Sequence, residues 1–309
     1  MKIVFMGTPD FAATVLSALL GSRHEVALVF TQPDRAKDRG KKIQCSPVKE
    51  QAAVQQIPVL QPERLRDDET ALAALKEAQP DIIVVAAYGQ ILPAAVLTLP
   101  RLGCVNVHAS LLPKLRGASP IQMAIAGGEE ETGVTIMQMA QGLDTGDILS
   151  ARAMKIGALN AGELSEALAE LGSALLLETL DKLEQGKITP VPQDESKATY
   201  AGLITKKDGQ IDFSRPAAEI ERKIRGFDPW PGAYCFCDGQ MLKIWKGEAP
   251  GLATKEKDGT VLSAGKDGLK VACGGSVLII SELQAAGKKR MKAADYLRGH
   301  RIEAGSMLT

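Results

Sequence analysis

The chain has 309 residues, 45% of them hydrophobic, and equal numbers of basic and acidic side chains leave it without net charge. This length and apolar content suffice for two moderate cores, so the sequence predicts two folded domains. No segment approaches the roughly 18 consecutive apolar residues of a membrane span, and the first residues have a strand pattern unlike a signal peptide, so we expect a soluble, cytoplasmic protein.

Charge and cysteines are distributed unevenly along the chain. Before Thr205 there are 19 Lys and Arg against 24 Asp and Glu, and after it there are 18 against 13. This asymmetry favours a polyanionic partner for the second half, with an ordinary basic surface as the alternative. The five cysteines have no CxxC spacing, which is typical of reduced structural thiols.

The first half alternates strand and helix patterns. Short apolar runs rich in β-branched residues occupy residues 2–7, 25–31, 81–87 and 104–110, and residues 67–78 have helical spacing. Such alternation predicts a Rossmann-like α/β domain with a mostly parallel sheet.

Two further strands and a long helix complete this domain. Residues 133–156 read as two strands joined by a turn at 143–146, and residues 161–186 as an amphipathic helix closed by Gly186. We therefore expect a catalytic domain over residues 1–190 and a linker over 191–208. Residues 209–309 contain short strands punctuated by Asp-Gly and Gly-Gly, which predict a small antiparallel, OB-like β-barrel.

The turn after the first strand argues against a nucleotide-phosphate site. In "MGTPDFA" a single glycine precedes Pro9, which has no N–H to donate, and Asp10, which repels phosphate. A dinucleotide-dependent dehydrogenase would need the glycines that this turn lacks.

Three polar residues form the candidate active site. Asn106 and His108 stand two positions apart on a predicted strand, so their side chains share one face, and Asp144 follows a later strand in "GLDTGD". Ligands bind at the carboxyl ends of strands in open α/β sheets, where we expect all three. The alternatives are two ordinary turn residues and a core histidine.

These side chains suit attack by an amine on a carbonyl. An amide N–H and an imidazolium donate to a developing oxyanion, and a carboxylate orients the imidazole. No nucleophilic Ser or Cys is needed, because the attacking group belongs to the substrate. His24 and His300 lack ligand-spaced partners, so we expect no metal.

The motifs resemble a known family. "NVHASLLPKLRGASPIQ" followed by "GLDTGD" is similar to the signature of formyltransferases that use 10-formyltetrahydrofolate, and "MGTPDFA", "AAYGQILP" and "FDPWPGA" extend the resemblance to the whole length of methionyl-tRNA formyltransferases. The resemblance implies a monomeric transferase that formylates initiator methionyl-tRNA for translation initiation, with Asn106, His108 and Asp144 as catalytic residues.

The resemblance also implies binding residues for both substrates. Those that would border the folate are Ser110, Leu111, Leu112, Pro113, Gln90 and Leu92. Those that would meet the tRNA, on a basic loop and in the second half, are Arg35, Lys37, Arg39, Lys41, Lys42, Lys206 and Lys207.

Departures from the family pattern and rival functions remain open at this point. Leu115 stands where an aromatic residue is usual, Ala140 where an acid is frequent and Cys45 where a proline is common. Rivals on the same fold are a glycinamide ribonucleotide formyltransferase, a formyltetrahydrofolate hydrolase and a sugar-nucleotide formyltransferase. A rival of another class is a noncatalytic RNA-binding protein.

Overall fold

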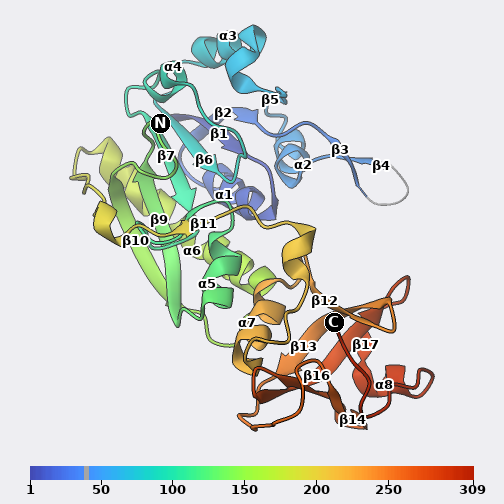
Figure 1. Cartoon of the computed structure of the whole chain (residues 1–309). Coiled ribbons are helices and arrows are strands. Elements are labelled where there is room, and N and C mark those ends of the chain that lie inside the picture. The colour runs from blue at the N-terminus through green and yellow to red at the C-terminus, as the bar shows by residue number, and fades with distance from the viewer. Residues whose placement is uncertain (38–41) are drawn as a thin grey trace. The chain divides into compact units, whose positions relative to one another are not determined.

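The computed structural model describes residues 1–37 and 42–309, and their contacts form two compact units (Figure 1). Unit 1 comprises Met1–Gly117, Thr132–Met154 and Ser165–Tyr200, and unit 2 comprises Ala118–Glu131, Lys155–Leu164 and Ala201–Thr309. This division differs from the expected boundaries in two respects. Two short segments from the expected catalytic domain, Ala118–Glu131 and Lys155–Leu164, belong to unit 2, and the expected linker contributes its residues up to Tyr200 to unit 1.

Unit 1 is built on a seven-stranded sheet in which five neighbouring strands are parallel. The predicted mostly parallel sheet is therefore confirmed, but β9 runs antiparallel to β7, and β10 lies at the edge beyond β9. In spatial order the strands are β10 (Ile148–Lys155), β9 (Glu131–Gln138), β7 (Cys104–His108), β6 (Ile82–Ala86), β1 (Lys2–Gly7), β2 (Glu25–Phe30) and β5 (Val59–Leu60).

Local sequence explains where the helices of this unit begin. The Ser46 side chain accepts a hydrogen bond from the Lys49 N–H ahead of Pro47, and the Asp68 side chain caps the following helix in the same way. All five residues of β6 are buried, as expected for a strand covered on both faces. The helices are α1 (Asp10–Leu20), α2 (Pro47–Val54), α3 (Glu69–Ala78), α4 (Ala94–Leu97) and α6 (Ala161–Glu184), whose residues up to Leu164 belong to unit 2.

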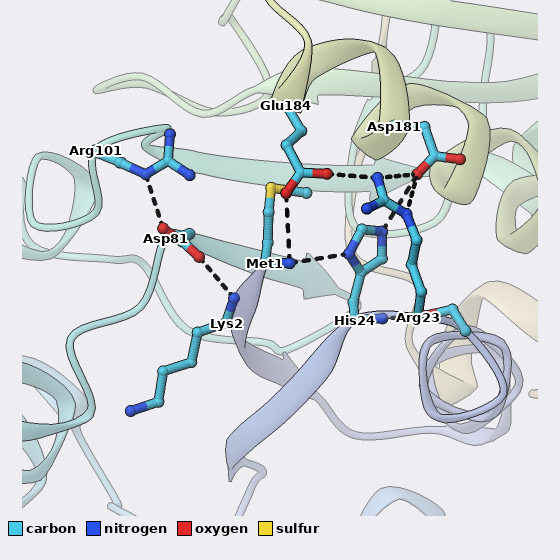
Figure 2. A network of polar contacts seen from close by, with 9 residues as sticks. Met1, Lys2, Arg23, His24, Asp81, Arg101, Asp181 and Glu184 are labelled. Carbon is cyan, nitrogen blue, oxygen red and sulfur yellow. Dashed lines mark hydrogen bonds and ion pairs between the residues drawn. The ribbon is translucent and has the colours of Figure 1, made fainter.

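A polar network joins the end of α6 to the sheet (Figure 2). The Arg23 guanidinium donates to Asp181 at 2.8 Å and also pairs with Glu184. Beside it, the buried His24 ring lies 3.4 Å from the Met1 amino group. Burial, followed by the positive Met1 amino group, lowers the pKa of His24. These contacts give His24 a structural role.

Unit 2 contains an antiparallel sheet of the predicted kind. Its two end strands are joined through the C-terminal residues, because Leu308 bridges to Cys237 and Met307 bridges to Thr260, just before β14. The order of pairings is thereby closed, which leaves no long unpaired edge. The strands in spatial order are β12 (Ala233–Cys237), β13 (Gln240–Glu248), β16 (Ser276–Ala285), β15 (Gly268–Cys273) and β14 (Val261–Gly265), with β17 (Met291–Lys292) paired to β16.

Three α-helices lie entirely in unit 2, and one of them completes its core. α7 (Ala217–Gly226) buries Ile220 and Ile224 against the strands, while the remaining helices are α5 (Pro120–Gly127) and α8 (Ala293–Leu297). Over the described residues, no helix has the length and apolar composition that crossing a membrane requires.

The cysteines differ in their environments, and this difference predicts their reactivity. Burial raises the pKa values of Cys104 and Cys235 to about 12, whereas Cys45 is only half-buried. Because the thiolate is the form that reacts, iodoacetamide at pH 8 should modify Cys45 first and leave the other two intact until the chain unfolds. Peptide mass spectrometry with and without guanidinium measures this order. Alkylation of native Cys104 as fast as Cys45 would show that its burial is wrong.

Candidate active site

β7 carries two of the three predicted catalytic residues. Asn106 lies between Val85 of β6 and Met137 of β9, and His108 lies opposite Thr135. Both therefore occupy one face of a central strand, as the alternation in the sequence predicts. Asn106 is half-buried, whereas His108 is 6% exposed.

The His108 ring has a partner at each nitrogen. Its Nε2 lies 3.1 Å from the Leu115 carbonyl, a contact that requires a proton on Nε2, and its Nδ1 lies 3.7 Å from Asp144 Oδ2. The second distance is too long for a hydrogen bond but close enough for charge interaction. The Leu115 contact is made by a backbone carbonyl, so the unusual side chain at this position does not remove it.

Asp144 reaches His108 by a route different from the predicted one. Because β9 is antiparallel to β7, Asp144 does not follow the carboxyl end of a parallel strand, and that part of the prediction was wrong. Asp144 lies instead in the connection from β9 to β10, in the left-handed region at φ +52°. Its Oδ2 accepts a hydrogen bond of 2.8 Å from the Gly117 N–H.

A buried arginine supports the same turn, and the sequence interpretation did not identify it. The Arg116 guanidinium is fully buried and donates to Gln193 Oε1 and, at 2.7 and 2.9 Å, to both oxygens of Glu195. Gln193 Nε2 in turn donates to the carbonyls of Asp144 and Gly146 at 2.8 and 2.7 Å. The only sequence signal was the Arg-Gly pair after the histidine motif, which does not reveal a partner 77 residues away.

The segment after His108 is held in place by buried hydrogen bonds. Ser110 Oγ donates to the Lys114 carbonyl at 2.6 Å, and the Leu112 N–H donates to Thr135 Oγ1 at 3.1 Å. Ser110 and Leu112 are buried, whereas Leu111 and Pro113 are half-buried. All four predicted folate-bordering residues of this segment therefore lie directly after β7.

Gln90 and Leu92 have mainly architectural contacts. The Gln90 amide accepts from the Leu65 N–H at 2.8 Å and donates to the Pro62 carbonyl at 2.9 Å, and Leu92 is 5% exposed in an apolar cluster that includes Leu65. Gln90 can therefore contribute to a folate pocket only by fixing the shape of the chain segment to which its side chain is hydrogen-bonded.

A cavity opens at the carboxyl ends of β1 and β2. Its volume is about 580 Å³, and it lies where the strand order reverses direction around β1, the usual ligand position in such sheets. Residues that line it include Thr8, Asp10, Gln32, Cys45 and Glu50.

The predicted tRNA-contacting residues belong to two separate segments of the chain. β3 (Arg35–Lys37) and β4 (Lys42–Gln44) pair as an antiparallel hairpin, while Arg39 and Lys41 lie outside the described residues. Lys206 and Lys207 are exposed on a short 3₁₀ helix of unit 2 that begins behind a Thr205–Asp208 capping box.

At the base of the hairpin, a charged pair is tightly hydrogen-bonded. Lys49 Nζ donates to Asp34 Oδ2 at 2.6 Å, and Gln61 donates to the other carboxylate oxygen at 2.7 Å. The Lys49 hydrogen bond, followed by that of Gln61, holds the pKa of Asp34 below its ordinary value. Lys49 therefore has a partner within the chain and is a poor candidate for a phosphate contact.

The sequence and the fold match one family of enzymes. Residues 1–180 match the family described as "Formyl transferase", and residues 203–301 match "Formyl transferase, C-terminal domain". The methionyl-tRNA formyltransferase of Caldanaerobacter subterraneus subsp. tengcongensis is 50% identical over 309 residues, with 100% of both chains covered. That of Lachnospira eligens is 49% identical over 314 residues, which cover 100% of this chain and 99% of the relative.

A solved structure with little sequence similarity has the same fold. The N-formyltransferase from Helicobacter canadensis, in complex with folinic acid and dTDP-3-aminofucose, superposes with a TM-score of 0.67 at 20% identity, covering 92% of this chain and 99% of that one. The full-length relatives decide the family where the fold alone does not. The chain belongs to the formyl transferase family, and the two full-length relatives described above are methionyl-tRNA formyltransferases.

Proposed function

We propose that this formyltransferase moves the formyl group of 10-formyltetrahydrofolate to the α-amino group of initiator methionyl-tRNA in the cytoplasm, as a monomer. The observation that carries the proposal is the placement of His108 between the Leu115 carbonyl and Asp144, on the strand that also presents Asn106. Full-length identity of about half to methionyl-tRNA formyltransferases supports the acceptor, and the folinic acid held by a structural neighbour supports a folate donor.

The proposed reaction is an addition followed by an elimination. The α-amine attacks the formyl carbon on N10, a C–N bond forms, and the carbonyl becomes an oxyanion. The bond to N10 then breaks, N10 gains a proton and the amine loses one. Esterification of the methionyl carboxylate lowers the amine's pKa below the usual value of about 7.7 to 8, so activation of the nucleophile is the smaller task.

Stabilising the oxyanion is the larger task, and Asn106 and His108 are the proposed donors. Because Nε2 already donates to the Leu115 carbonyl, Nδ1 carries a hydrogen only in the imidazolium form of His108. Nδ1 lies 3.7 Å from Asp144, which is not a hydrogen bond, so in that form its N–H can be donated to a substrate oxygen. The Asp144 carboxylate, fixed by the Gly117 N–H, then stabilises the imidazolium and holds its orientation. This transfer uses no metal.

Lys206 and Lys207 are proposed to bind tRNA phosphates rather than to take part in the chemistry. The double change Lys206→Ala with Lys207→Ala should raise the KM for methionyl-tRNA several-fold and leave kcat unchanged. The slope of log binding constant against log salt concentration should become shallower by about one for each phosphate contact that is lost. Steady-state kinetics and tRNA titrations over a range of salt concentrations measure both effects. An unchanged KM and salt slope would remove these lysines from the tRNA surface.

A second acceptor is favoured by one observation, the neighbour solved with an amino-sugar nucleotide. Competition between acceptors separates the two functions. With donor labelled in the formyl group, the proposal predicts label in charged initiator tRNA and none in dTDP-3-aminofucose or free formate. Label in the sugar nucleotide would assign the chain to the sugar branch, and release of formate alone would assign it to hydrolysis.

A further inference from the structure

We infer that Gln193 and Arg116 are positioning residues for formyl transfer: they hold the turn that carries Asp144, so that its carboxylate stays beside His108. The inference rests on the proposed catalytic role of Asp144 and adds two residues that do not touch the reacting atoms themselves. Through Gln193, the last segment of unit 1, Ser165–Tyr200, supports the active site.

Hydrogen bonding fixes the orientation of the Gln193 amide. Arg116 has only donors, and its Nε and Nη2 reach Gln193 Oε1 at 3.1 and 2.7 Å. The opposite end lies 2.8 Å from the Asp144 carbonyl and 2.7 Å from the Gly146 carbonyl, both acceptors. Only oxygen toward Arg116 and nitrogen toward the turn satisfies all four contacts, so the amide has one orientation.

The Gln193 amide nitrogen donates to two backbone carbonyls of the turn that carries Asp144. The carbonyls of Asp144 and Gly146 are two residues apart, and one –NH₂ group has a hydrogen for each. Asp144 itself is in the left-handed region, which an aspartate adopts at a cost of about 1 kcal/mol or more unless its surroundings impose it. The two hydrogen bonds from Gln193 are therefore part of what imposes it.

The other end of the network reaches the Asp144 carboxylate itself. Gly117, whose N–H donates to Asp144 Oδ2, directly follows Arg116, and the Arg116 N–H donates to the Thr199 carbonyl at 2.8 Å. Arg116 thus links the two groups that support Asp144. It directly precedes Gly117, which binds the Asp144 carboxylate, and its side chain binds Gln193, which holds the Asp144 backbone carbonyl. Glu195, which is 66% exposed at its side chain, completes the set by accepting from both terminal nitrogens of Arg116.

Gln193→Glu tests the inference by exchanging one heavy atom, the amide nitrogen for an oxygen. The carboxylate still accepts from Arg116, but its second oxygen faces two carbonyl oxygens with no hydrogen between them, so the turn is repelled. We expect kcat to fall about ten- to a hundredfold, as a shift of about 1 Å at a reacting group does, while both KM values stay within about twofold. Gln193→Met, which adds no charge, should lower kcat in the same direction.

Gln138→Glu is the matched control in the same unit. The Gln138 side-chain amide also donates to two backbone carbonyls, those of Leu102 and Cys104. Gln138 meets the Asp144 turn only through its backbone, whose N–H donates to the Asp147 carbonyl and is the same in both residues. It receives the same chemical change and should keep kcat near the wild-type value. Comparable kcat losses in the two variants would show that Gln193 matters only for general stability and would overturn the inference.

Hydrogen exchange at the Gly117 amide gives a readout that does not depend on activity. Because this amide donates to Asp144, its exchange should become at least about tenfold faster in Gln193→Glu and stay unchanged in Gln138→Glu. If the wild type does not formylate methionyl-tRNA, the proposed function fails and the inference, as stated for formyl transfer, fails with it. If the wild type is active while Gln193→Glu retains both kcat and Gly117 protection, only the inference fails.

Discussion

His108→Ala should lower the rate of formyl transfer by about two to three decades while tRNA binding persists. The imidazole is 6% exposed, lies 3.7 Å from Asp144 and is one of two proposed donors to the oxyanion. Loss of one such donor costs roughly 3 to 4 kcal/mol of transition-state stabilisation. Asn106→Ala removes the other donor, and Asp144→Asn keeps an acceptor for the Gly117 N–H but loses the charge, so both should cause losses of similar size.

Single-turnover rates on charged initiator tRNA, with binding of uncharged tRNA in parallel, measure these losses. His300→Ala is the matched control, because His300 stacks on Tyr296 in unit 2 and its ring bonds to the Tyr296 carbonyl. That variant should transfer formyl at the wild-type rate. If His108→Ala binds tRNA normally and also transfers at the wild-type rate, the chemistry does not occur on β7.

Gly146→Ala should damage both the stability of unit 1 and the rate of transfer. A Cβ at this position would lie 1.7 Å from the Gln138 carbonyl oxygen, which is backbone and has nowhere to move without breaking the pairing of Gln138 with Asp147. We expect the free energy of unfolding to fall by about 1 to 3 kcal/mol, as for overpacked cores. Displacement of the Asp144 turn should lower kcat about a hundredfold.

Urea unfolding and steady-state kinetics at a temperature where the variant is folded separate the two effects. Gly265→Ala is the control, since its Cβ would meet no atom within 4 Å and its φ is not positive. Its stability and kcat should match the wild type. Wild-type kcat in folded Gly146→Ala would mean that the turn tolerates displacement, and Asp144 would then have no precise catalytic role.

The strands of the candidate site could be predicted from the local sequence. They are buried on both faces of the sheet, so their residues form continuous apolar runs in the sequence. The register that pairs Asn106 and His108 with β9 follows from contacts across the sheet and is not visible in a single strand. The antiparallel direction of β9 was missed for the same reason, since strand direction depends on how connections cross the sheet. Closure of the unit 2 sheet by Met307 and Leu308 likewise depends on pairing between distant segments.

The candidate site was predictable where chemistry is concentrated in short motifs. Asn106, His108 and Asp144 have side chains that few structural roles require in that arrangement. Arg116 and Gln193 were not predictable, because an arginine and a glutamine in sequence are more often solvated surface residues. Their role follows only from burial and from hydrogen bonds across 77 residues.

A crystal structure of the chain with a formylated folate that cannot transfer its formyl group would test the assignment of the catalytic residues most directly. We expect the formyl oxygen within hydrogen-bond distance of the Asn106 amide and the His108 ring, with Asp144 still held by the Gly117 N–H. A formyl group bound away from β7, for example in the cavity lined by Thr8 and Gln32, would contradict the assignment of the catalytic residues.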